Sequence, residues 1–457
     1  MKVLKFGGTS VGSVESLNNV KKIVESISGE AVIVVSALGG LTDKLIATAK
    51  MAAEGDSEWL KEMDAISLRH HDIIKNVVSN EKQSLIKSAV DEHLTELKRN
   101  YEGVFLLRSL PEKVLDVIVS FGERMSSIIV AAMVDHGKRY YSPDFIKTEK
   151  WYGKNIADRK LTDKLIKETL GKLGKNEKAI IPGFISTDST TGEITNLGRG
   201  GSDYTGALIA AALGAEILEI WTDVDGFMTA DPRIVKDALI IDHLTFTESM
   251  ELCTFGAKVI YPPTIYPVFH SNIPIKILNT FNPDAPGTLI TDQAQQDDLE
   301  VKGVTSLKDV ALITINIKSF NDIKDPLKRA LNTLSRQAVR IIPVANPDPY
   351  TELNFAVTAS DAEVSLEMLE KEFAPEISSG KIEKPILKGN LAAVALVGID
   401  MRSRSRLAAR IGHSLRRQGI NVEAYSAGNS DTTLIYIINQ EKSDEALPLI
   451  HSLVFEL

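Results

Sequence analysis

Residues 1–13 read MKVLKFGGTSVGS, and this stretch sets the pattern from which the fold can be deduced. A short apolar run, Val3–Phe6, predicts a buried strand, and a Gly-Gly turn followed by residues 14–27 predicts a helix. The same order returns at Ala31–Val35 (AVIVV), the turn SALGG and a helix that begins near Thr42. Strand, glycine turn and helix in repetition predict an α/β domain with a mostly parallel sheet sandwiched by helices. Ligands of such sheets bind at the carboxyl ends of the strands, where these turns lie.

The opening stretch also places a lysine, Lys5, inside an apolar run. An unpartnered buried ammonium group is costly, so an anion is expected to meet it. Gly7 and Gly8 allow backbone amides to approach an anion, and the helix behind them adds a partial positive charge. A strand-end turn with a lysine that reaches back to solvent explains the stretch as well, and on these residues alone both interpretations stay open.

Composition limits the classes of function. The chain has 457 residues with 44% apolar and 25% charged residues, as expected for a globular protein of about three domains. The net charge of −9 disfavours nucleic acid or an anionic membrane as the main partner. One cysteine, Cys253, excludes an internal disulfide and favours a reducing, cytoplasmic location. No signal peptide and no membrane helix are expected.

The chain divides into a long α/β part and a C-terminal part with an internal repeat. Residues 56–109 are polar and leucine-spaced, which predicts a helical excursion on the α/β core. After a polar linker at residues 291–298, the order βαββα occurs twice, which predicts two ferredoxin-like units. The second copy lacks room for a closing strand, so a strand near 299–304 is expected to complete it and to nest the two units. The predicted domains are therefore 1–295, 305–388 and 389–457.

Three further clusters lie before residue 300. LGRGGSDYTGA presents Arg199 and Asp203 on a glycine-rich loop, which favours a site for a carboxylate or phosphate over a structural turn. SFGER places Glu123 after an apolar run, and by itself a first-turn helix charge is the better explanation. WTDVDGFMTADPR and FGAKVIYPPT, with Lys258, fit either a nucleotide loop or a solvated loop. Convergent cations beside glycines suit phosphoryl transfer.

With these residues laid out, the chain resembles an aspartokinase over nearly its whole length. The motifs that carry the resemblance occur in the right order: KFGGTSVG, VVSALGGLTDKL, SFGER, LGRGGSDYTGA, WTDVDG with TADPR, and FGAKVIYPPT. The C-terminal repeats resemble ACT domains, which are small amino-acid-sensing modules. The resemblance is to the amino-acid kinase fold followed by ACT units.

The resemblance implies transfer of the γ-phosphoryl group of MgATP to the side-chain carboxylate of L-aspartate, with Mg²⁺ brought in by ATP and no metal site of the protein's own. The implied catalytic residues are Lys5, Asp203 and Lys258. Those implied for aspartate are Ser36, Thr42, Glu123, Arg199 and Ser202, with Glu123 for the α-ammonium and Arg199 for the α-carboxylate. Those implied for the nucleotide are Lys5, Gly7, Gly8, Ser10, Thr222, Asp223, Arg233 and Lys258.

The sequence departs from the family at some positions. Met228 stands where a nucleotide-stacking tyrosine is common, and Tyr261 replaces a frequent histidine. Arg340 occupies a position where an aspartate is common in the first ACT unit, and this charge reversal should repel a lysine effector. Because the sequence ends at Leu457, we expect a monofunctional enzyme without a fused homoserine dehydrogenase, and a homodimer formed through the ACT units.

Two other functions remain to be separated from this one. The first is another amino-acid kinase, such as one acting on glutamate, against which the two ACT-like repeats weigh. The second is a non-catalytic amino-acid sensor with a retired kinase domain, against which Lys5, Asp203 and Lys258 weigh.

Overall fold

A computed structural model describes residues 1–151, 154–295, 299–319, 323–336, 339–342, 344, 351–426 and 431–455. The chain forms two compact units. The first comprises Met1–Phe227, Asp242–Phe246 and Val259–Ala294, and the second comprises Met228–Ile241, Thr247–Lys258 and Gln295–Leu457. Two short segments therefore leave the catalytic part of the sequence to fold with the C-terminal unit.

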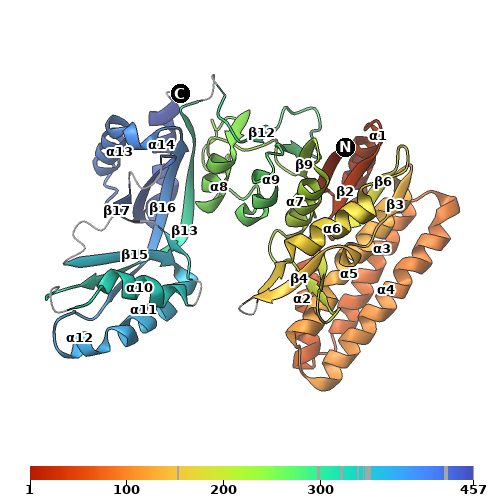
Figure 1. Ribbon diagram of the computed structural model, residues 1–457, viewed down its shortest axis with the longest axis horizontal. Coiled ribbons are helices and arrows are strands. Elements are labelled where there is room, and N and C mark those ends of the chain that lie inside the picture. Colours follow the sequence, from red (N-terminus) through yellow and green to blue (C-terminus); the bar gives the residue numbers. More distant parts are fainter. Residues whose placement is uncertain are drawn as a thin grey trace. The chain divides into compact units, whose positions relative to one another are not determined.

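An eight-stranded sheet forms the centre of the first unit (Figure 1). Its order is β10-β12-β11-β9-β1-β2-β6-β3, and every pair is parallel except β11 with β12. The strands are β1 (Lys2–Phe6), β2 (Ala31–Val35), β3 (Gly137–Arg139), β6 (Lys178–Pro182), β9 (Ile217–Thr222), β10 (His243–Thr245), β11 (Ile275–Asn279) and β12 (Thr288–Thr291). The predicted α/β fold class with a mostly parallel sheet is confirmed.

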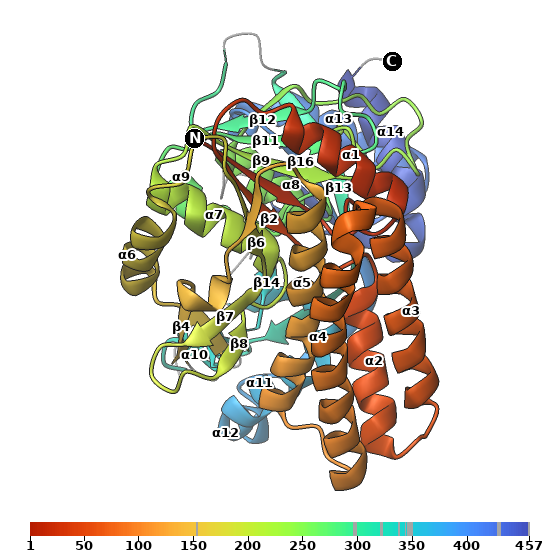
Figure 2. The ribbon, with the colours of Figure 1, turned by 90° about the vertical axis from the view of Figure 1, so that its right-hand side faces the viewer.

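Helices cover both faces of this sheet. They are α1 (Val14–Glu25), α2 (Leu41–Glu54), α3 (Trp59–Val77), α4 (Asn80–Leu107), α5 (Glu112–Met133), α6 (Arg159–Leu170), α7 (Gly201–Leu213) and α9 (Tyr266–Phe269), with 3₁₀ turns η1 (Ser142–Asp144) and η2 (Pro262–Thr264). The helical excursion predicted for residues 56–109 is α3 with α4, and Figure 2 shows α2 to α5 standing side by side. A smaller sheet of order β5-β4-β7-β8 completes the unit: β4 (Lys147–Trp151), β5 (Lys154–Ala157), β7 (Ile185–Asp188) and β8 (Ile194–Asn196).

The alternation of side chains along β1 decides where its lysine points. Leu4 and Phe6 belong to the buried cluster formed with α1 to α5. Lys5 lies between them in the sequence, and neighbouring side chains of a strand point to opposite faces of the sheet. Its Cβ therefore lies on the face covered by α7, 3.5 Å from the position that a Cβ on Gly206 would take.

An antiparallel sheet of six strands, order β14-β15-β13-β16-β18-β17, forms the centre of the second unit. Its strands are β13 (Val301–Asn316), β14 (Ile341–Ile342), β15 (Glu352–Thr358), β16 (Ile386–Gly398), β17 (Val422–Ser426) and β18 (Thr433–Asn439). The strand expected near 299–304 and the strand after it are one continuous element, β13. It pairs along its length with β16, through register shifts, so both repeats share one sheet. The pairing of β13 with β16 is the physical basis of the predicted nesting.

The helices of the second unit are α8 (Phe246–Thr254), α10 (Pro326–Ser335), α11 (Ala359–Glu372), α12 (Ala374–Ser378), α13 (Ser405–Arg417) and α14 (Ser443–Phe455), with η4 (Met401–Ser403) and η5 (Gln440–Lys442). Of these, α8 begins at Phe246, the last residue of a first-unit segment. The predicted linker at 291–298 lies partly outside the described residues. The domain limits 1–295, 305–388 and 389–457 stay a prediction. Within the described ranges, none of the helices has the length and apolarity required to cross a membrane.

Candidate active site

A cavity of about 350 Å³ opens in the first unit where several glycine loops meet helix starts. It is lined by Gly8 after β1, by Ser36 and the glycines after β2, by the start of α2, by Glu123 of α5 and by the loop before α7. Because the carboxyl ends of β1 and β2 share one edge of the parallel sheet, their following loops meet there. Among the predicted residues, those that line this cavity are Lys5, Gly8, Ser36, Thr42, Glu123, Arg199, Ser202 and Asp203.

Lys5 has a carboxylate partner across the cavity. Its Nζ lies 2.5 Å from Oδ1 of Asp203, in the first turn of α7, and both side chains are mostly buried. This pair gives the lysine an anionic partner and holds its ammonium group at the cavity wall. A cation fixed in this way can meet an anionic ligand without first being ordered, as preorganised catalysis requires.

Close packing of two loops explains why glycines stand at Gly8 and Gly39. A Cβ on Gly8 would come within 3.2 Å of the carbonyl oxygen of Ala37, and one on Gly39 within 3.0 Å of that of Gly8. The loops after β1 and β2 therefore touch backbone to backbone. Gly7 contributes its amide differently, by donating to the carbonyl of Trp221 at 3.1 Å.

Glu123 is the buried carboxylate of the site, with 3% of its surface exposed. Its Oε1 accepts a hydrogen bond from the amide of Ala37 at 3.1 Å, whereas its Oε2 has no partner among the described residues. Burial raises the pKa of Glu123 to about 8, although the Ala37 amide opposes this shift. An unpaired carboxylate oxygen at a cavity wall is a receptor for a cationic group such as an ammonium.

Arg199 lies at the exposed rim of the cavity. Its guanidinium carbon lies 5.9 Å from the centre of the ring of Tyr261, within the range of a cation–π contact. A guanidinium group in this place offers a planar pair of donors to a carboxylate. Ser36, Thr42 and Ser202 supply further polar side chains to the lining.

Other predicted residues lie outside the cavity lining. Ser10 is buried; its hydroxyl donates to the carbonyl of Trp221 at 3.2 Å and accepts from the hydroxyl of Thr280 at 2.7 Å. It thereby ties the first loop to the ends of two neighbouring strands. Thr222 ends β9 and donates to the carboxylate of the exposed Asp223 at 3.3 Å.

Two predicted cations belong to the second unit. Arg233 pairs with Asp231 at 2.6 Å, and Lys258 is exposed at the end of the segment Thr247–Lys258. The hydrogen bonds from Arg233 lower the pKa of Asp231, and the charge of Lys258 contributes to the same shift. These three charges are therefore neighbours within that unit, and their role at a nucleotide stays a prediction.

Some lining residues were missed by sequence reasoning. Asp43, in the first turn of α2, and Phe184 both line the cavity. Phe184 has a positive φ of 68°, an unusual conformation for an aromatic residue. The motif LTDK held a signal for Asp43, because an acidic residue near a helix start faces the strand-end loops. No feature of the sequence marks Phe184.

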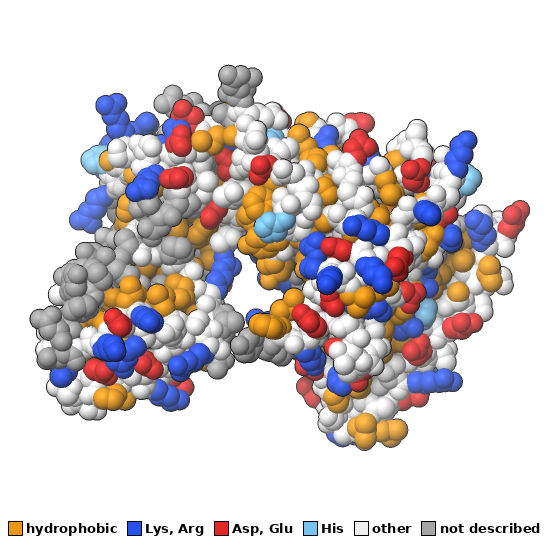
Figure 3. All heavy atoms as spheres, viewed as in Figure 1, with side chains coloured by type: hydrophobic (Ala, Val, Ile, Leu, Met, Phe, Trp, Pro, Cys, Tyr) orange, Lys and Arg blue, Asp and Glu red, His pale blue; other side chains and the backbone are white. Residues whose placement is uncertain are grey.

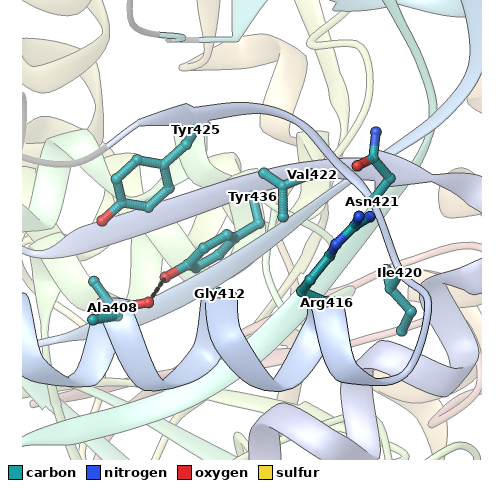
Figure 4. Close-up of a pocket in the computed structure, with 9 residues that line it drawn as sticks. Ala408, Gly412, Arg416, Ile420, Asn421, Val422, Tyr425 and Tyr436 are labelled. Atoms are coloured by element: carbon teal, nitrogen blue, oxygen red, sulfur yellow. Dashed lines mark hydrogen bonds between the residues drawn. The ribbon is translucent and has the colours of Figure 1, made fainter.

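A second cavity, of about 450 Å³, lies in the C-terminal unit between α13 and β17 (Figure 4). Its helix side is built from Ala408, Ala409 and Gly412, and its other wall carries Tyr425, whose ring lies 4.9 Å from that of Tyr436. Figure 4 shows Arg416 extending toward Asn421 at one end. The described lining contains no Asp or Glu and no strand-end glycine loop. Its chemistry does not suit phosphoryl transfer, which leaves the first cavity as the candidate active site.

No group of three or more His, Cys, Asp or Glu side chains in the described part of the chain is arranged to hold a metal ion. The candidate site combines the cations Lys5 and Arg199 with the carboxyl groups of Glu123, Asp203 and Asp43.

The model of the Amino acid kinase family matches residues 1–279, and that of an ACT domain matches residues 394–453. The chain belongs to the amino acid kinase family. Within this family it is similar to the bifunctional aspartokinase/homoserine dehydrogenase of Haemophilus influenzae, with 31% identity over 100% of this chain and 56% of the relative. It is also 28% identical to aspartokinase 1, chloroplastic, of Arabidopsis thaliana, over 99% of this chain and 80% of that protein.

Solved structures of this kinase family agree in fold. Escherichia coli aspartokinase III in complex with aspartate and ADP (R-state) superposes with a TM-score of 0.84 at 26% identity, over 100% of both chains. The aspartate kinase of Clostridium acetobutylicum gives 0.80 at 26% identity, over 99% of this chain and 100% of that one. The resemblance to aspartokinases is confirmed. The chain spans about half the length of the first curated relatives that it matches.

Proposed function

We propose that this protein is an aspartate kinase that transfers the γ-phosphoryl group of MgATP to the side-chain carboxylate of L-aspartate. The products are 4-phospho-L-aspartate and ADP, and the reaction is the first step toward lysine, threonine and methionine. The relatives carry the name of this activity, and the residues that line the first cavity of this chain support it.

The observation that carries the proposal is that three complementary groups face one cavity. Glu123 offers an unpaired carboxylate oxygen, Arg199 a guanidinium group, and Lys5 an ammonium group held by Asp203. An α-amino acid presents an ammonium group and a carboxylate to the first two. A side-chain carboxylate then faces the third, where an incoming phosphoryl group needs its charge neutralised.

The chain's residues have a limited chemical task in this reaction. A carboxylate oxygen of aspartate forms a bond to the γ-phosphorus, and the bond from that phosphorus to the β–γ bridging oxygen breaks with its electron pair leaving on ADP. The nucleophile is already an anion at neutral pH, so no general base is needed. Lys5 neutralises charge on the transferring group, Asp203 orients Lys5, and the loop of Gly7 and Gly8 flanks the phosphates.

The remaining proposed contacts concern the nucleotide, which enters as MgATP. Thr222, Asp223 and Arg233 are assigned to the nucleotide, with Ser10 buttressing the first loop, and Lys258 is assigned to the phosphates. These assignments follow the family motifs and the location of each residue at a strand end or on a loop.

An ADP-release assay with coupled detection tests the proposal. Aspartate, glutamate and N-acetylglutamate are compared at equal concentration with MgATP. We expect turnover with aspartate and little with N-acetylglutamate, because acetylation removes the ammonium group that Glu123 would receive. Preference for glutamate would establish another amino-acid kinase instead. Absence of turnover with all three would favour the amino-acid sensor.

Regulation by an amino acid forms a second part of the proposal. E. coli aspartokinase III has been solved in complex with lysine and aspartate (T-state). In this chain Arg340 adds a positive charge in the first ACT repeat, and like charges repel a lysine ammonium group. We therefore expect weak or absent inhibition by lysine. Titration with lysine, threonine and methionine, singly and paired, measures this, and strong inhibition by micromolar lysine would contradict it.

We also propose a homodimer formed through the ACT repeats. Leu327 and Leu331 of α10 and Val364 of α11 are exposed on two neighbouring helices, and Figure 3 shows hydrophobic side chains gathered over this region. Contiguous exposed apolar residues mark interaction surfaces. Sedimentation of the Leu331→Asp variant should give a smaller species than the native protein, and an unchanged sedimentation coefficient would contradict this interface.

A further inference from the structure

Residues 255–258, which end in Lys258, follow the carboxyl end of α8. Arg340, from the first ACT repeat, contacts that end of the helix. The guanidinium group of Arg340 donates a hydrogen bond to the carbonyl oxygen of Thr254, the last residue of α8. The last carbonyls of a helix have no partner within it and carry partial negative charge, so a guanidinium group is a favourable cap.

Three further attachments hold the chain that follows. Phe255 is buried in the cluster that contains Ile342 of β14, and its carbonyl accepts a hydrogen bond from the hydroxyl of Thr305 at 3.2 Å. Gly256 adopts a φ of +133° and runs so close to β13 that a Cβ there would lie 2.3 Å from a backbone oxygen. The amide of Ala257 donates back to Leu252 at 3.0 Å. The backbone is thus fixed up to the residue before Lys258.

Arg340 comes from a different part of the sheet than the β13 residue Thr305. It lies next to β14, an edge strand of the six-stranded sheet, whereas Thr305 belongs to β13 in the centre of that sheet. Through Arg340, the residue before β14 is connected directly to the end of the helix that leads to Lys258. The guanidinium group of Arg340 thus has a backbone carbonyl as its partner.

We propose that Arg340 is a positioning residue for Lys258: by capping α8 at Thr254, it fixes the segment that presents the Lys258 ammonium group to the phosphates of the nucleotide. This inference rests on the proposed function for the role of Lys258. It assigns to Arg340 an effect on the nucleotide and none on aspartate, because Glu123 and Arg199, the residues proposed for aspartate, belong to the first unit, whereas Arg340 and Lys258 belong to the second.

The test is a double-mutant cycle that reads nucleotide binding directly. The dissociation constant of MgADP is measured by calorimetry for the native protein, Arg340→Ala, Lys258→Ala and the double variant. We expect Arg340→Ala to weaken MgADP binding about 3- to 10-fold, since a charged hydrogen bond is lost. In the Lys258→Ala background the same change should have no further effect, because residues that act through one another are not additive.

Steady-state kinetics supply the second readout. Arg340→Ala should raise the KM for ATP and leave the KM for aspartate unchanged, and Arg340→Lys, which keeps one donor, should recover part of the loss. The matched control is Arg336→Ala, which removes an exposed arginine four residues away and should behave like the native protein. Equal MgADP binding in Arg340→Ala and native protein, or additive effects in the cycle, would overturn the proposal.

Two measures keep the outcome decisive. If Arg340→Ala does not fold, as judged by its thermal transition, Thr305→Val replaces it, because that change removes the other side-chain bond to the same segment. It should then weaken MgADP binding in the same sense, and unchanged binding would count against the proposal. Native protein that binds MgADP but does not phosphorylate aspartate would refute the proposed function while leaving the cycle interpretable.

Discussion

Two cavities among the described residues, one in each unit, are similar in size and opposite in chemistry. The first, of about 350 Å³, is lined by glycine loops, a buried ion pair and a carboxylate with an unpaired oxygen. The second, of about 450 Å³, is bounded by small aliphatic residues and two tyrosines. Volume alone would favour the second. What distinguishes the first is the buried carboxyl group of Glu123, whose Oε2 has no hydrogen-bond partner among the described residues, at a cost in stability that a ligand would recover.

The difference teaches that a functional site is recognised by what remains unsatisfied in it. Tyr436 in the second cavity donates to the carbonyl of Ala408 at 3.0 Å, so this buried hydroxyl already has its partner. Among the residues that the structure describes, none gives Oε2 of Glu123 in the first cavity such a partner. Substitutions in the first cavity should therefore change catalysis, whereas those in the second should change stability only.

The largest effect is expected for Lys5→Ala. Removal of the cation that faces the transferring phosphoryl group should lower kcat about 10³-fold or more, while the fold remains intact. Lys2→Ala is the matched control, since Lys2 lies on the same strand but pairs with Glu219 at 2.9 Å. Steady-state kinetics and a thermal melt check both variants. A kcat of Lys5→Ala near the native value would remove Lys5 from the catalytic residues.

Arg199→Ala comes next. Loss of the partner of the α-carboxylate should raise the KM for aspartate by about 30-fold, corresponding to roughly 2 kcal/mol, the lower end for a charged pair because Arg199 is exposed. The KM for ATP should change far less. Arg199→Lys is the matched variant and should fall in between, since it keeps the charge and loses the planar pair of donors. Equal changes in both KM values would argue against α-carboxylate recognition.

Glu123→Gln should alter the pH dependence of aspartate binding. Burial raises the pKa of Glu123 to about 8, so the carboxylate form that an ammonium group requires becomes populated as the pH rises toward that value. The KM for aspartate of the native protein should fall between pH 6.5 and 8.5, whereas the variant should show a high, pH-independent KM. Glu112→Gln, on the same helix at an exposed position, is the control.

The same pKa has a consequence for stability. A carboxyl group whose folded pKa lies above its unfolded value of 4.5 binds protons more tightly in the folded state. The free energy of unfolding therefore decreases as the pH rises through the range from 4.5 to about 8. Glu123→Gln removes this dependence, so its gain in melting temperature over the native protein should be larger at pH 8 than at pH 5. The opposite trend would show that the carboxylate is already paired.

The smallest effects are expected from two matched glycine substitutions. A Cβ on Gly412, in the second cavity, meets no heavy atom within 4 Å, so Gly412→Ala should stabilise the helix by about 0.5–1 kcal/mol without changing turnover. A Cβ on Gly8, in the first cavity, would press on the Ala37 carbonyl, so Gly8→Ala should lower turnover. Thermal denaturation and kinetics measure both. A loss of activity in Gly412→Ala would erase the contrast between the cavities.

Much of the fold was accessible from the sequence because the apolar runs are short and clearly bounded. The predicted strands 31–35 and 178–182 match β2 and β6, since continuous buried apolar runs flanked by turns leave little choice. The prediction of nested repeats was confirmed in outline. The fusion of its strands into the single β13 was missed, because Lys308 and Asp309 resemble a turn. In the structure these two residues lie at a shift in the register with β16, between the paired residues Leu307 and Val310, and Asp309 has a positive φ of 58°.

The sequence marked some residues of the candidate site and not others. Lys5, Arg199 and Asp203 stood out because a charge beside glycines is unusual at a strand end, and all three line one cavity. Glu123 by itself looked like an ordinary helix charge, and only the structure shows that it is buried with its Oε1 accepting from the amide of Ala37. Lys258 and Arg233 were placed with the rest of residues 1–295 from the sequence, whereas the contacts of the folded chain group both with the second unit.

The sequence by itself determined which segments are strands and helices, and which charges must find partners, because hydrophobic periodicity and the cost of a buried charge are local properties. Only the tertiary structure decided that Asp203 meets Lys5 and that Glu123 keeps one oxygen unpaired. It also decided that Arg340 caps the helix leading to Lys258. These contacts depend on how segments that are distant in the sequence come together in the fold, and local sequence patterns do not specify those distances.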